Sequence, residues 1–285
     1  MSDAPVPVRA AVHVRDGRLH VDLAGTSPRV RGNVNCPRAV ARAAGVFAVR
    51  TLVDDDVPTN DGVGRALVLS VPAGCAADAP RGAAVAADNV EMSQRLTDVI
   101  FAALADAGLD VAAQGQGTMN NVTFGGVTVG GVTSGGAGAD GGPWTFYETL
   151  GGGQGASSRG PGPTGVHVGM SNTLNTPVEA LERAYPLRVE RYAVREGSGG
   201  GGRHDGGDGV VREYRALAPC TVTLLTERRA RAPRGAEGGG DGATGRNALG
   251  ERGLPAKCRV EVAVGEVVRI ETPGGGGWGR RPHEP

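Results

Sequence analysis

The stretch Gly165–Tyr214 reads GVHVGMSNTLNTPVEALERAYPLRVERYAVREGSGGGGRHDGGDGVVREY. It predicts a short helix after the capping pattern at Thr176–Glu179 and an alternating strand over Leu187–Val194. A glycine-dense loop, Ser198–Gly209, leads to another strand. Glycine is costly to order, so its density here indicates backbone that lies close to a ligand, a metal-bound group or another chain. The N–H groups of the loop could surround an anion; the alternative is an ordinary long hairpin connection.

Periodicity outside this stretch predicts two further helices and several strands. Asn89–Ala107 carries one apolar stripe, with Asp88 placed to cap the helix and Gly108 placed to end it. A second helix is expected to begin at Pro37, with Asn35 or Cys36 as its cap. Gly265-Glu266 is a hairpin signal between the last two strands. Strands are predicted over Leu19–Leu23, Leu67–Val71, Asn121–Phe124, Trp144–Tyr147, Val210–Leu217, Cys220–Thr226, Arg259–Val264 and Val267–Thr272.

These elements predict an α+β fold with β-rich mixed or antiparallel sheets, a few packed helices and glycine-rich loops. The expected organisation is a flexible N-terminal segment over residues 1–10 and a single domain over residues 11–285, with a mobile loop over residues 235–253. Glycine (50) and proline (18) make up about 24% of the 285 residues, just below the range that suggests disorder.

Charge and apolar runs limit the class of protein. Thirty basic and thirty acidic residues give a net charge of +0, so no overall field attracts nucleic acid or an anionic membrane. No apolar run reaches the roughly 20 residues of a membrane helix, and the N-terminus has no apolar signal core. The four cysteines are far apart in sequence, which predicts reduced thiols and a cytoplasmic location.

Motifs for cofactors and metals are missing from the sequence. A Walker A loop needs a lysine that reaches the phosphates, but Lys257 is the only lysine and lies between Ala256 and Cys258. Gly160–Gly165 fits GxGxxG by spacing, without a strand before it or a helix after it. The five histidines form no HxH, HxxH or HExxH pair. We therefore predict no cofactor-binding residues and no complete metal site in this chain.

His167, Glu91 and Glu179 are the candidate catalytic residues. A neutral imidazole at His167, near the Asn172 amide, could carry a proton or polarise a carbonyl. The alternative for His167 is a strand histidine that bonds to a backbone carbonyl. Glu91 and Glu179 have the chemistry of general acids or bases, but both also occupy capping-box positions.

Asparagine side chains supply the candidate substrate-binding groups. Asn33 and Asn35 point to the same side if the chain between them is extended, and could hold an imide or carbonyl. The alternative is that one of them caps the following helix. Asn120 and Asn121, in a glycine-rich setting, either line a pocket or make turns. Asn172 completes the predicted substrate-binding set.

Several further segments, taken in order with the opening stretch, resemble the hydantoinase B/oxoprolinase family. The resemblance runs nearly end to end and covers the C-terminal half of a typical member. The segments are VDLAGTSPRVRGNVNCP (Val21–Pro37), PTNDG (Pro58–Gly62), NVEMSQRLTDVIFAAL (Asn89–Leu104), GTMNNVTFGG (Gly117–Gly126), FYETLGGGQGA (Phe146–Ala156) and TPGGGGWG (Thr272–Gly279).

The resemblance implies a B-type subunit, or the C-terminal part of one, in an ATP-dependent hydantoinase or 5-oxoprolinase that opens a cyclic amide or imide. It implies three things about partners: a hydantoinase A-like ATPase subunit, the N-terminal half of the B subunit as a separate chain, and ATP and a divalent metal on those chains. The chain is expected to be inactive alone. The alternatives are a non-catalytic assembly module, a truncated inactive remnant, or a ketone carboxylase subunit.

Overall fold

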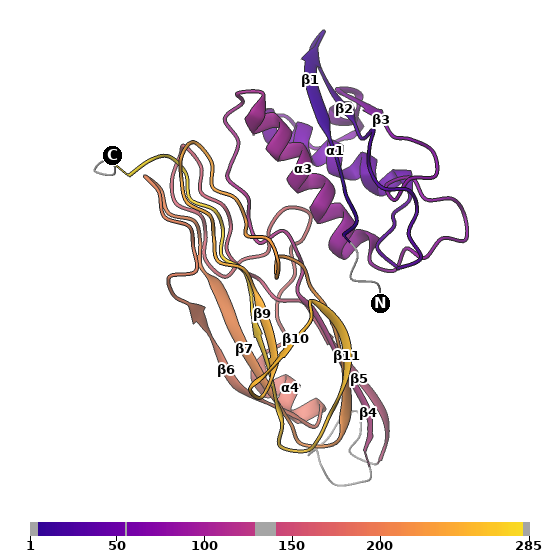
Figure 1. Ribbon diagram of the computed structural model, residues 1–285, viewed down its shortest axis with the longest axis vertical. Coiled ribbons are helices and arrows are strands. Elements are labelled where there is room, and N and C mark those ends of the chain that lie inside the picture. Colours follow the sequence, from indigo (N-terminus) through magenta and orange to yellow (C-terminus); the bar gives the residue numbers. More distant parts are fainter. Residues whose placement is uncertain (1–4, 55, 129–140, 282–285) are drawn as a thin grey trace. The chain divides into compact units, whose positions relative to one another are not determined.

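The computed structural model describes residues 5–54, 56–128 and 141–281 (Figure 1). The chain divides into two compact units. Unit 1 runs to Ala112 and includes Gly169–Ser171, whereas unit 2 holds Ala113–Val168 and the chain from Asn172 onward. The expected α+β class is confirmed. That the two units act as one domain over residues 11–285 stays a prediction.

Unit 1 packs helices against a small three-stranded sheet of order β1-β2-β3. β1 and β2 form an antiparallel hairpin, and β2 pairs with β3 in parallel. The hairpin turns at Asp16 and Gly17, which both have positive φ, as a tight two-residue turn requires. The elements are β1 (Ala11–Arg15), β2 (Arg18–Asp22), α1 (Arg38–Leu52), α2 (Asp61–Arg65), β3 (Leu67–Ser70), η1 (Asp88–Met92) and α3 (Ser93–Asp106).

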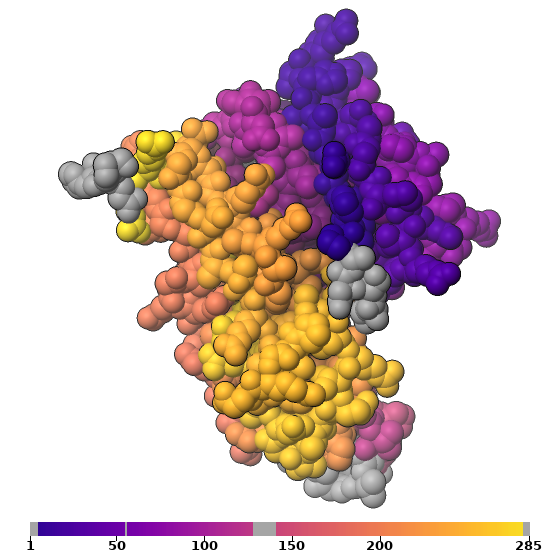
Figure 2. Space-filling view, viewed as in Figure 1, coloured from indigo at the N-terminus to yellow at the C-terminus, as the bar shows by residue number. Residues whose placement is uncertain are grey.

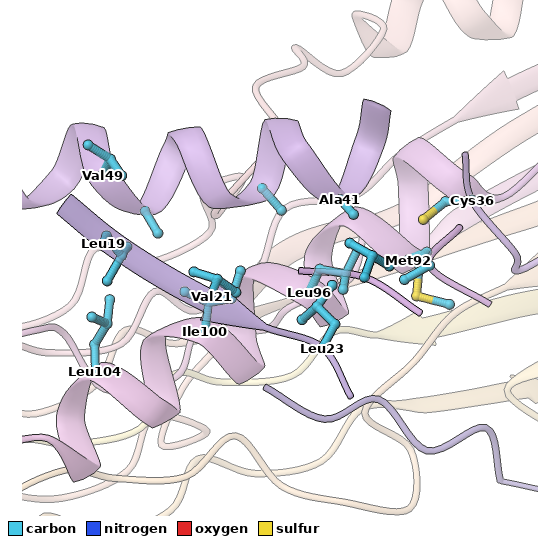
Figure 3. Close-up of a cluster of buried hydrophobic side chains, with 14 of the residues drawn as sticks. Leu19, Val21, Leu23, Cys36, Ala41, Val49, Met92, Leu96, Ile100 and Leu104 are labelled. Carbon is cyan, nitrogen blue, oxygen red and sulfur yellow. The ribbon is translucent and has the colours of Figure 1, made fainter. Parts of the chain in front are cut away.

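The core of unit 1 lies between β2 and the two long helices (Figure 3). Leu19 and Val21 alternate with exposed or half-buried residues along β2, so that one face of the strand is buried. Leu96, Ile100 and Leu104 of α3 recur at helical spacing and are fully buried against that face. The apolar stripe expected in Asn89–Ala107 is therefore confirmed.

The first turn of that helix differs from the prediction. Residues of η1 form a π-helical turn before α3 begins at Ser93. Asp88 lies inside this turn and accepts the N–H of Asn89 at 2.6 Å, so the predicted cap by Asp88 is wrong. Gly108, with a φ of 81°, follows the end of α3 as predicted. The sequence predicted no helix at α2.

Unit 2 contains two antiparallel sheets, of order β10-β9-β12-β7-β6 and β11-β8-β4-β5. Their buried sides share one apolar core, in which the rings of Phe124 and Tyr214 lie 5.0 Å apart across the sheets. The elements are β4 (Asn121–Thr128), β5 (Gly142–Glu148), α4 (Val178–Ala184), β6 (Leu187–Arg195), β7 (Gly209–Ala216), β8 (Cys220–Leu225), β9 (Arg246–Leu249), β10 (Arg252–Leu254), β11 (Lys257–Val262) and β12 (Val267–Glu271).

The hairpin predicted at Gly265-Glu266 is wrong. β11 pairs with β8 in one sheet, whereas β12 pairs with β7 and β9 in the other. The turn is tight, with a φ of 86° at Gly265 and a bond from the N–H of Glu266 to the carbonyl of Ala263. The turn carries the chain from β11 in one sheet to β12 in the other. The buried residues of the two strands therefore enter the shared core from opposite sides.

Two other local predictions need correction. The helix α4 exists, but Pro177 precedes it without a side-chain cap, and the N–H of Thr176 donates to Glu148 Oε1. Residues 235–253 were expected to be a loop, yet they contain β9 and part of β10. The mobility predicted for that segment stays a prediction.

The glycine-rich segments of unit 2 pack together as a bundle of extended chains. We call residues 113–116, 151–156, 162–166, 198–209, 233–243 and 273–279 the glycine bundle. Along residues 274–277, the first three N–H groups donate to three different neighbouring segments. The fourth N–H donates to the same segment as the first. The acceptors, in order, are the carbonyls of Ala243, Gly207, Gln114 and Gly240. This three-residue rotation is the pattern of a polyproline II-type helix.

Glycine is required in the bundle because the backbones approach one another too closely for a Cβ atom. A Cβ at Gly275 would lie 2.0 Å from the carbonyl oxygen of Gln154, and one at Gly207 would lie 1.9 Å from that of Pro163. Figure 1 shows the segments as extended traces beyond the strands, and Figure 2 shows orange and yellow parts of unit 2 interleaved on one face. The glycine density predicted a close approach of the backbone to another group, and in the structure that group is the backbone of the same chain.

Candidate functional site

The predicted site residues are divided between the two units. Unit 1 holds Glu91, Asn33 and Asn35, and unit 2 holds the other five. The residues of unit 2 are His167, Glu179, Asn120, Asn121 and Asn172. The predicted roles stay predictions, and the geometry within each unit shows what each side chain is placed to do.

In unit 1, the start of α3 and the preceding π turn bury a row of polar side chains. Glu91, Ser93, Gln94 and Thr97 are each 3% exposed or less. Ser93 Oγ donates to the carbonyl of Asn89, and Thr97 Oγ1 donates to that of Ser93, so both hydroxyls bond to the helix itself. Glu91 and Gln94 are three residues apart and therefore share a helix face. A buried carboxyl is suited to proton transfer, and a buried carboxamide is suited to binding an amide.

Asn35 is fully buried and its carboxamide holds a loop together. Its Oδ1 accepts the N–H of Val30 at 2.8 Å, and its Nδ2 lies within 2.9 Å of the carbonyls of Val30, Gly32 and Ala84. The predicted helix cap is not its role, because Pro37 occupies the N-cap position of α1. Asn33 is half-buried, and its backbone carbonyl accepts the N–H of Ala87. The geometry therefore favours a structural role for Asn35.

In unit 2, a buried set of amides and one arginine meets where β4 begins and β8 and β9 lie close. We call Gln116, Asn120, Thr226, Arg229 and Asn247 the Asn120 network. Asn120 Nδ2 donates to Gln116 Oε1 at 2.6 Å, and Arg229 donates to Asn120 Oδ1 at 2.5 Å and to Asn247 Oδ1 at 2.7 Å. Asn247 Nδ2 donates to Thr226 Oγ1 at 3.1 Å. The network thus brings a guanidinium into a buried amide environment.

Two residues of this region have unusual backbone conformations. Asn120 has a φ of 46° and Arg228 a φ of 60°, both in the left-handed region. Asparagine tolerates this conformation, whereas for a long side chain such as arginine it is uncommon.

Asn121 lies at the start of β4, next to the network. Its Nδ2 donates to the carbonyl of Leu225 at 3.0 Å, and its Oδ1 accepts from the hydroxyl of Tyr147 at 2.6 Å. The only lysine, Lys257, forms an ion pair with Glu227, whose N–H donates to Thr118 Oγ1. These contacts surround the turn that carries Arg228 and Arg229.

His167 is half-buried in unit 2, beside a residue that touches the network. Burial lowers its pKa, which favours the neutral imidazole near pH 7. The preceding residue, Val166, pairs with Gly152, and its carbonyl lies 3.5 Å from Gln116 Nε2. A neutral imidazole can accept a proton, as the prediction for His167 requires.

Glu179 and Asn172 are exposed on the surface of unit 2. Glu179 lies in the first turn of α4, where a carboxylate interacts favourably with the helix dipole. Neither residue belongs to the Asn120 network, and the structure does not bring them together with it.

A second buried polar cluster in unit 2 escaped the sequence analysis. Arg212 on β7 is fully buried, and its Nη2 lies 3.4 Å from Glu148 Oε2. Tyr214 donates its hydroxyl to Glu148 and accepts from Arg212 Nε, while the guanidinium stacks 4.2 Å over the ring of Tyr192. Burial, and then the Glu148 carboxylate, hold the pKa of Tyr214 well above its usual value. The sequence signal that could have revealed this cluster is a charged residue, Arg212, at a core-facing position of β7.

Removing one partner of such a pair leaves a buried charge uncompensated, which costs about 3–5 kcal/mol. Tyr192 Oη donates to Asn175 Oδ1 at 2.8 Å, and Asn175 Nδ2 donates to the carbonyl of Thr149 at the same distance. The cluster therefore anchors the chain before α4 to β5 and β6. We interpret it as structural.

Two observations on the described residues concern metals and membranes. No group of three or more histidine, cysteine, aspartate or glutamate side chains there is placed to hold a metal ion. Within the same residues, every helix is too short or too polar to cross a bilayer. The assignment of ATP and a divalent metal to other chains stays a prediction, as does the cytoplasmic location.

Comparisons with known proteins agree with the resemblance. A family model described as hydantoinase B/oxoprolinase matches residues 1–281. The chain is 40% identical to 5-oxoprolinase 1 of Arabidopsis thaliana over 96% of its own length and 20% of that protein. It is 36% identical to an uncharacterized protein of Methanocaldococcus jannaschii over 99% of its length and 48% of that protein.

Among solved structures, the ATP-dependent caprolactamase from Pseudomonas jessenii is similar with a TM-score of 0.78 and 19% identity. The similarity covers 99% of this chain and 53% of the caprolactamase chain. At that identity the likeness shows the fold alone. The chain spans one fifth of the plant relative and about half of the other two proteins.

Proposed function

Because the chain belongs to the hydantoinase B/oxoprolinase family, we propose that it is a B-type subunit, or the C-terminal part of one, of an ATP-dependent enzyme that opens a cyclic amide or imide. The observation that carries the proposal is the 40% identity to a 5-oxoprolinase over 96% of the chain. The chain spans only a fifth of that relative, so the complete activity needs further polypeptide.

The proposed reaction is hydrolysis of a ring C–N bond. A hydroxyl from water adds to the carbonyl carbon, the C–N bond breaks, and the ring nitrogen takes up a proton. Amide resonance makes this addition slow, and ATP supplies the activation by phosphorylating the ring amide oxygen on the partner side, with release of ADP. Breakage of the C–N bond then leaves an acyl phosphate, which a second water hydrolyses to the carboxylate and inorganic phosphate. Hydrogen-bond donors that face the developing oxyanion, and a base that takes the proton from water, are the parts a protein provides.

The side chains of this chain support such a role. Glu91 in unit 1 and His167 in unit 2 are the candidate proton-transfer groups, and burial favours the neutral, proton-accepting form of His167. In unit 1, the buried carboxamide of Gln94 near Glu91 has the polarity of an amide-binding group. The proposed partners are a hydantoinase A-like ATPase and the N-terminal half of the B subunit, which bring ATP and a divalent metal.

Co-expression tests the proposal. The chain is produced with an A-type ATPase and an N-terminal B half, and the release of glutamate and ADP from 5-oxo-L-proline and ATP is measured. We expect turnover by the complex, none by the chain alone, and a loss of at least 100-fold with His167→Gln or Glu91→Gln. The matched control is Glu251→Gln, an exposed carboxyl outside the predicted site, which separates a site effect from a general charge effect.

Other outcomes identify the alternatives. Full turnover by a complex that carries both His167→Gln and Glu91→Gln would show that this chain is a non-catalytic assembly module. A complex that consumes ATP only with acetone and bicarbonate would be a ketone carboxylase. Turnover of 5-oxoproline at ordinary enzymatic rates by the chain alone would contradict the subunit proposal.

A further inference from the structure

Gln94 is the one buried polar side chain of α3 whose donor group makes no hydrogen bond to the described residues. It is 1% exposed, and among the described residues its Nε2 has no hydrogen-bond partner. Its neighbours on the same helix, Ser93 and Thr97, bond to helix carbonyls. A buried N–H donor that has no partner destabilises a fold, so Gln94 Nε2 needs an explanation.

The contrast with other buried carboxamides sharpens this point. Asn35 in the same unit makes four hydrogen bonds to the backbone, and Gln116 in unit 2 bonds through both ends of its carboxamide. These side chains hold the fold together. Gln94 Nε2 makes no such bond within the described part of the fold. A hydrogen bond to a group outside the chain would explain why this donor is buried.

A glycine in the left-handed region lies directly against the carboxamide of Gln94. Gly169, which belongs to unit 1, has a φ of 58°, and a Cβ there would lie 2.6 Å from Gln94 Oε1. Only glycine therefore fits at position 169 without displacing Gln94. One helical turn before Gln94, the carboxyl of Glu91 is equally buried. Glu91 lies in the π-helical turn η1, and Gln94 follows it at the start of α3. Such turns are found often at functional sites.

We propose that the carboxamide of Gln94 binds the ring amide of the substrate through a pair of hydrogen bonds. Nε2 donates to the ring carbonyl oxygen, and Oε1 accepts the ring N–H. A small lactam or cyclic imide suits this partner because the ring holds its amide cis, so that N–H and C=O point to the same side. A primary carboxamide presents the complementary donor and acceptor side by side. The substrate class rests on the function proposed above.

This arrangement makes Gln94 a specificity-determining residue. An ordinary peptide bond is trans, so its N–H and C=O point in opposite directions and cannot both reach one carboxamide. Unpaired polar groups in a site that was built to bond them are a strong source of discrimination. The enzyme would thus select cyclic amides over open-chain amides and N-alkylated rings.

The test crosses two ligands with two forms of the protein. Binding of 5-oxo-L-proline and of its N-methyl derivative is measured by calorimetry on the co-expressed complex, with wild-type Gln94 and with Gln94→Met. Methionine keeps the length and shape of glutamine without its hydrogen bonds. We expect the substitution to weaken 5-oxoproline binding about 100-fold and to change binding of the N-methyl derivative less than threefold. Equal losses for both ligands, or no loss for either, would overturn the inference.

A stability measurement separates this role from a structural one. Gln94→Met is expected to leave the melting temperature of the ligand-free protein unchanged or raised, because it removes a buried donor without a partner. Gln116→Met, the matched control, removes a bonded carboxamide and is expected to lower it by several degrees. A comparable drop for Gln94→Met would show that Gln94 is bonded within the protein, and the inference would fail.

The two proposals fail in different ways. Gln94-dependent binding of 5-oxoproline without ATP-dependent ring opening would remove the proposed hydrolase function and leave the amide-binding role in place. Ring opening with an unchanged KM in Gln94→Met would do the reverse. A wild-type complex that binds neither 5-oxoproline, hydantoin nor caprolactam would overturn the role of Gln94.

Discussion

At the residue scale, buried carboxamides in this chain serve distinct ends. Asn35 and Asn120 have their polar atoms bonded to the backbone or to neighbouring side chains, whereas Gln94 Nε2 has no partner among the described residues. Sequence context cannot separate these cases, because all three are polar residues beside apolar or glycine-rich runs. The distinction rests on whether groups distant in sequence, such as Ala84 for Asn35, come within bonding distance.

The role of Asn35 leads to a prediction about stability. Asn35→Ala leaves buried backbone groups of the loop without partners, and we expect it to lower the free energy of unfolding of unit 1 by about 3 kcal/mol. The matched control, Asn33→Ala, removes a half-buried side chain two residues away and should stay within about 0.5 kcal/mol. Urea denaturation followed by circular dichroism compares them. Equal effects at both positions would contradict the structural role of Asn35.

His167 leads to a prediction about pH. Its folded pKa lies below the unfolded value because burial penalises the imidazolium, so the unfolded chain binds this proton more readily. Above about pH 7 both states are neutral and His167 adds no pH dependence. As pH falls through the ordinary histidine range near 6.5, the folded state loses stability. Melting temperatures between pH 8 and 5 should therefore fall less steeply for His167→Gln than for the wild type; parallel slopes would show that His167 titrates normally.

At the element scale, the glycine bundle departs furthest from what glycine-rich sequence suggests. The loop Ser198–Gly209 was expected to present free N–H groups to a ligand or an anion. Its N–H groups at Gly200, Gly206 and Gly207 instead donate to carbonyls of the bundle, and that at Gly199 donates to Asp208. The density of glycine is explained by backbone packing, because each segment has neighbours on several sides at distances that exclude a Cβ.

A pair of glycine substitutions tests the bundle. Gly275→Ala places a methyl group 2.0 Å from a backbone carbonyl that cannot move aside without disturbing the neighbouring segments. We expect it to cost about 3 kcal/mol or more, with a large drop in melting temperature. Gly253→Ala in β10 is the control, since a Cβ there meets nothing within 4 Å, and it should be nearly neutral. Differential scanning calorimetry compares them, and equal melting temperatures would refute close packing at Gly275.

At the scale of the whole molecule, the chain covers only part of the proteins it is similar to. With no nucleotide motif in the sequence, we predict that the purified chain shows no ATP binding by calorimetry, and that ATP binds once the ATPase partner is present. Micromolar affinity of the chain alone for ATP would contradict the division of labour proposed here. We further expect low yield of the chain alone and higher yield on co-expression, because surfaces that contact partners would otherwise be exposed.

Local sequence patterns predicted much of the secondary structure but little of the candidate functional site. The apolar stripe of α3 and the alternation in β5 were recognisable because each element buries one face of its own sequence. The segment Gly265-Glu266 misled, because a tight turn has the same local chemistry whether the next strand pairs with the previous one or crosses to another sheet. The cluster of Glu148 and Arg212 was missed because their pairing joins residues 64 positions apart.

The amino-acid sequence by itself determined the family, the α+β class and the positions of most helices and strands, since these depend on periodicity and on short motifs read along the chain. Only the tertiary structure decided which strands share a sheet, why the glycines are needed, and which buried amides have spare hydrogen-bonding capacity. The physical reason is that close approach and hydrogen-bond satisfaction are properties of pairs of atoms, and in this chain the paired atoms lie far apart in sequence.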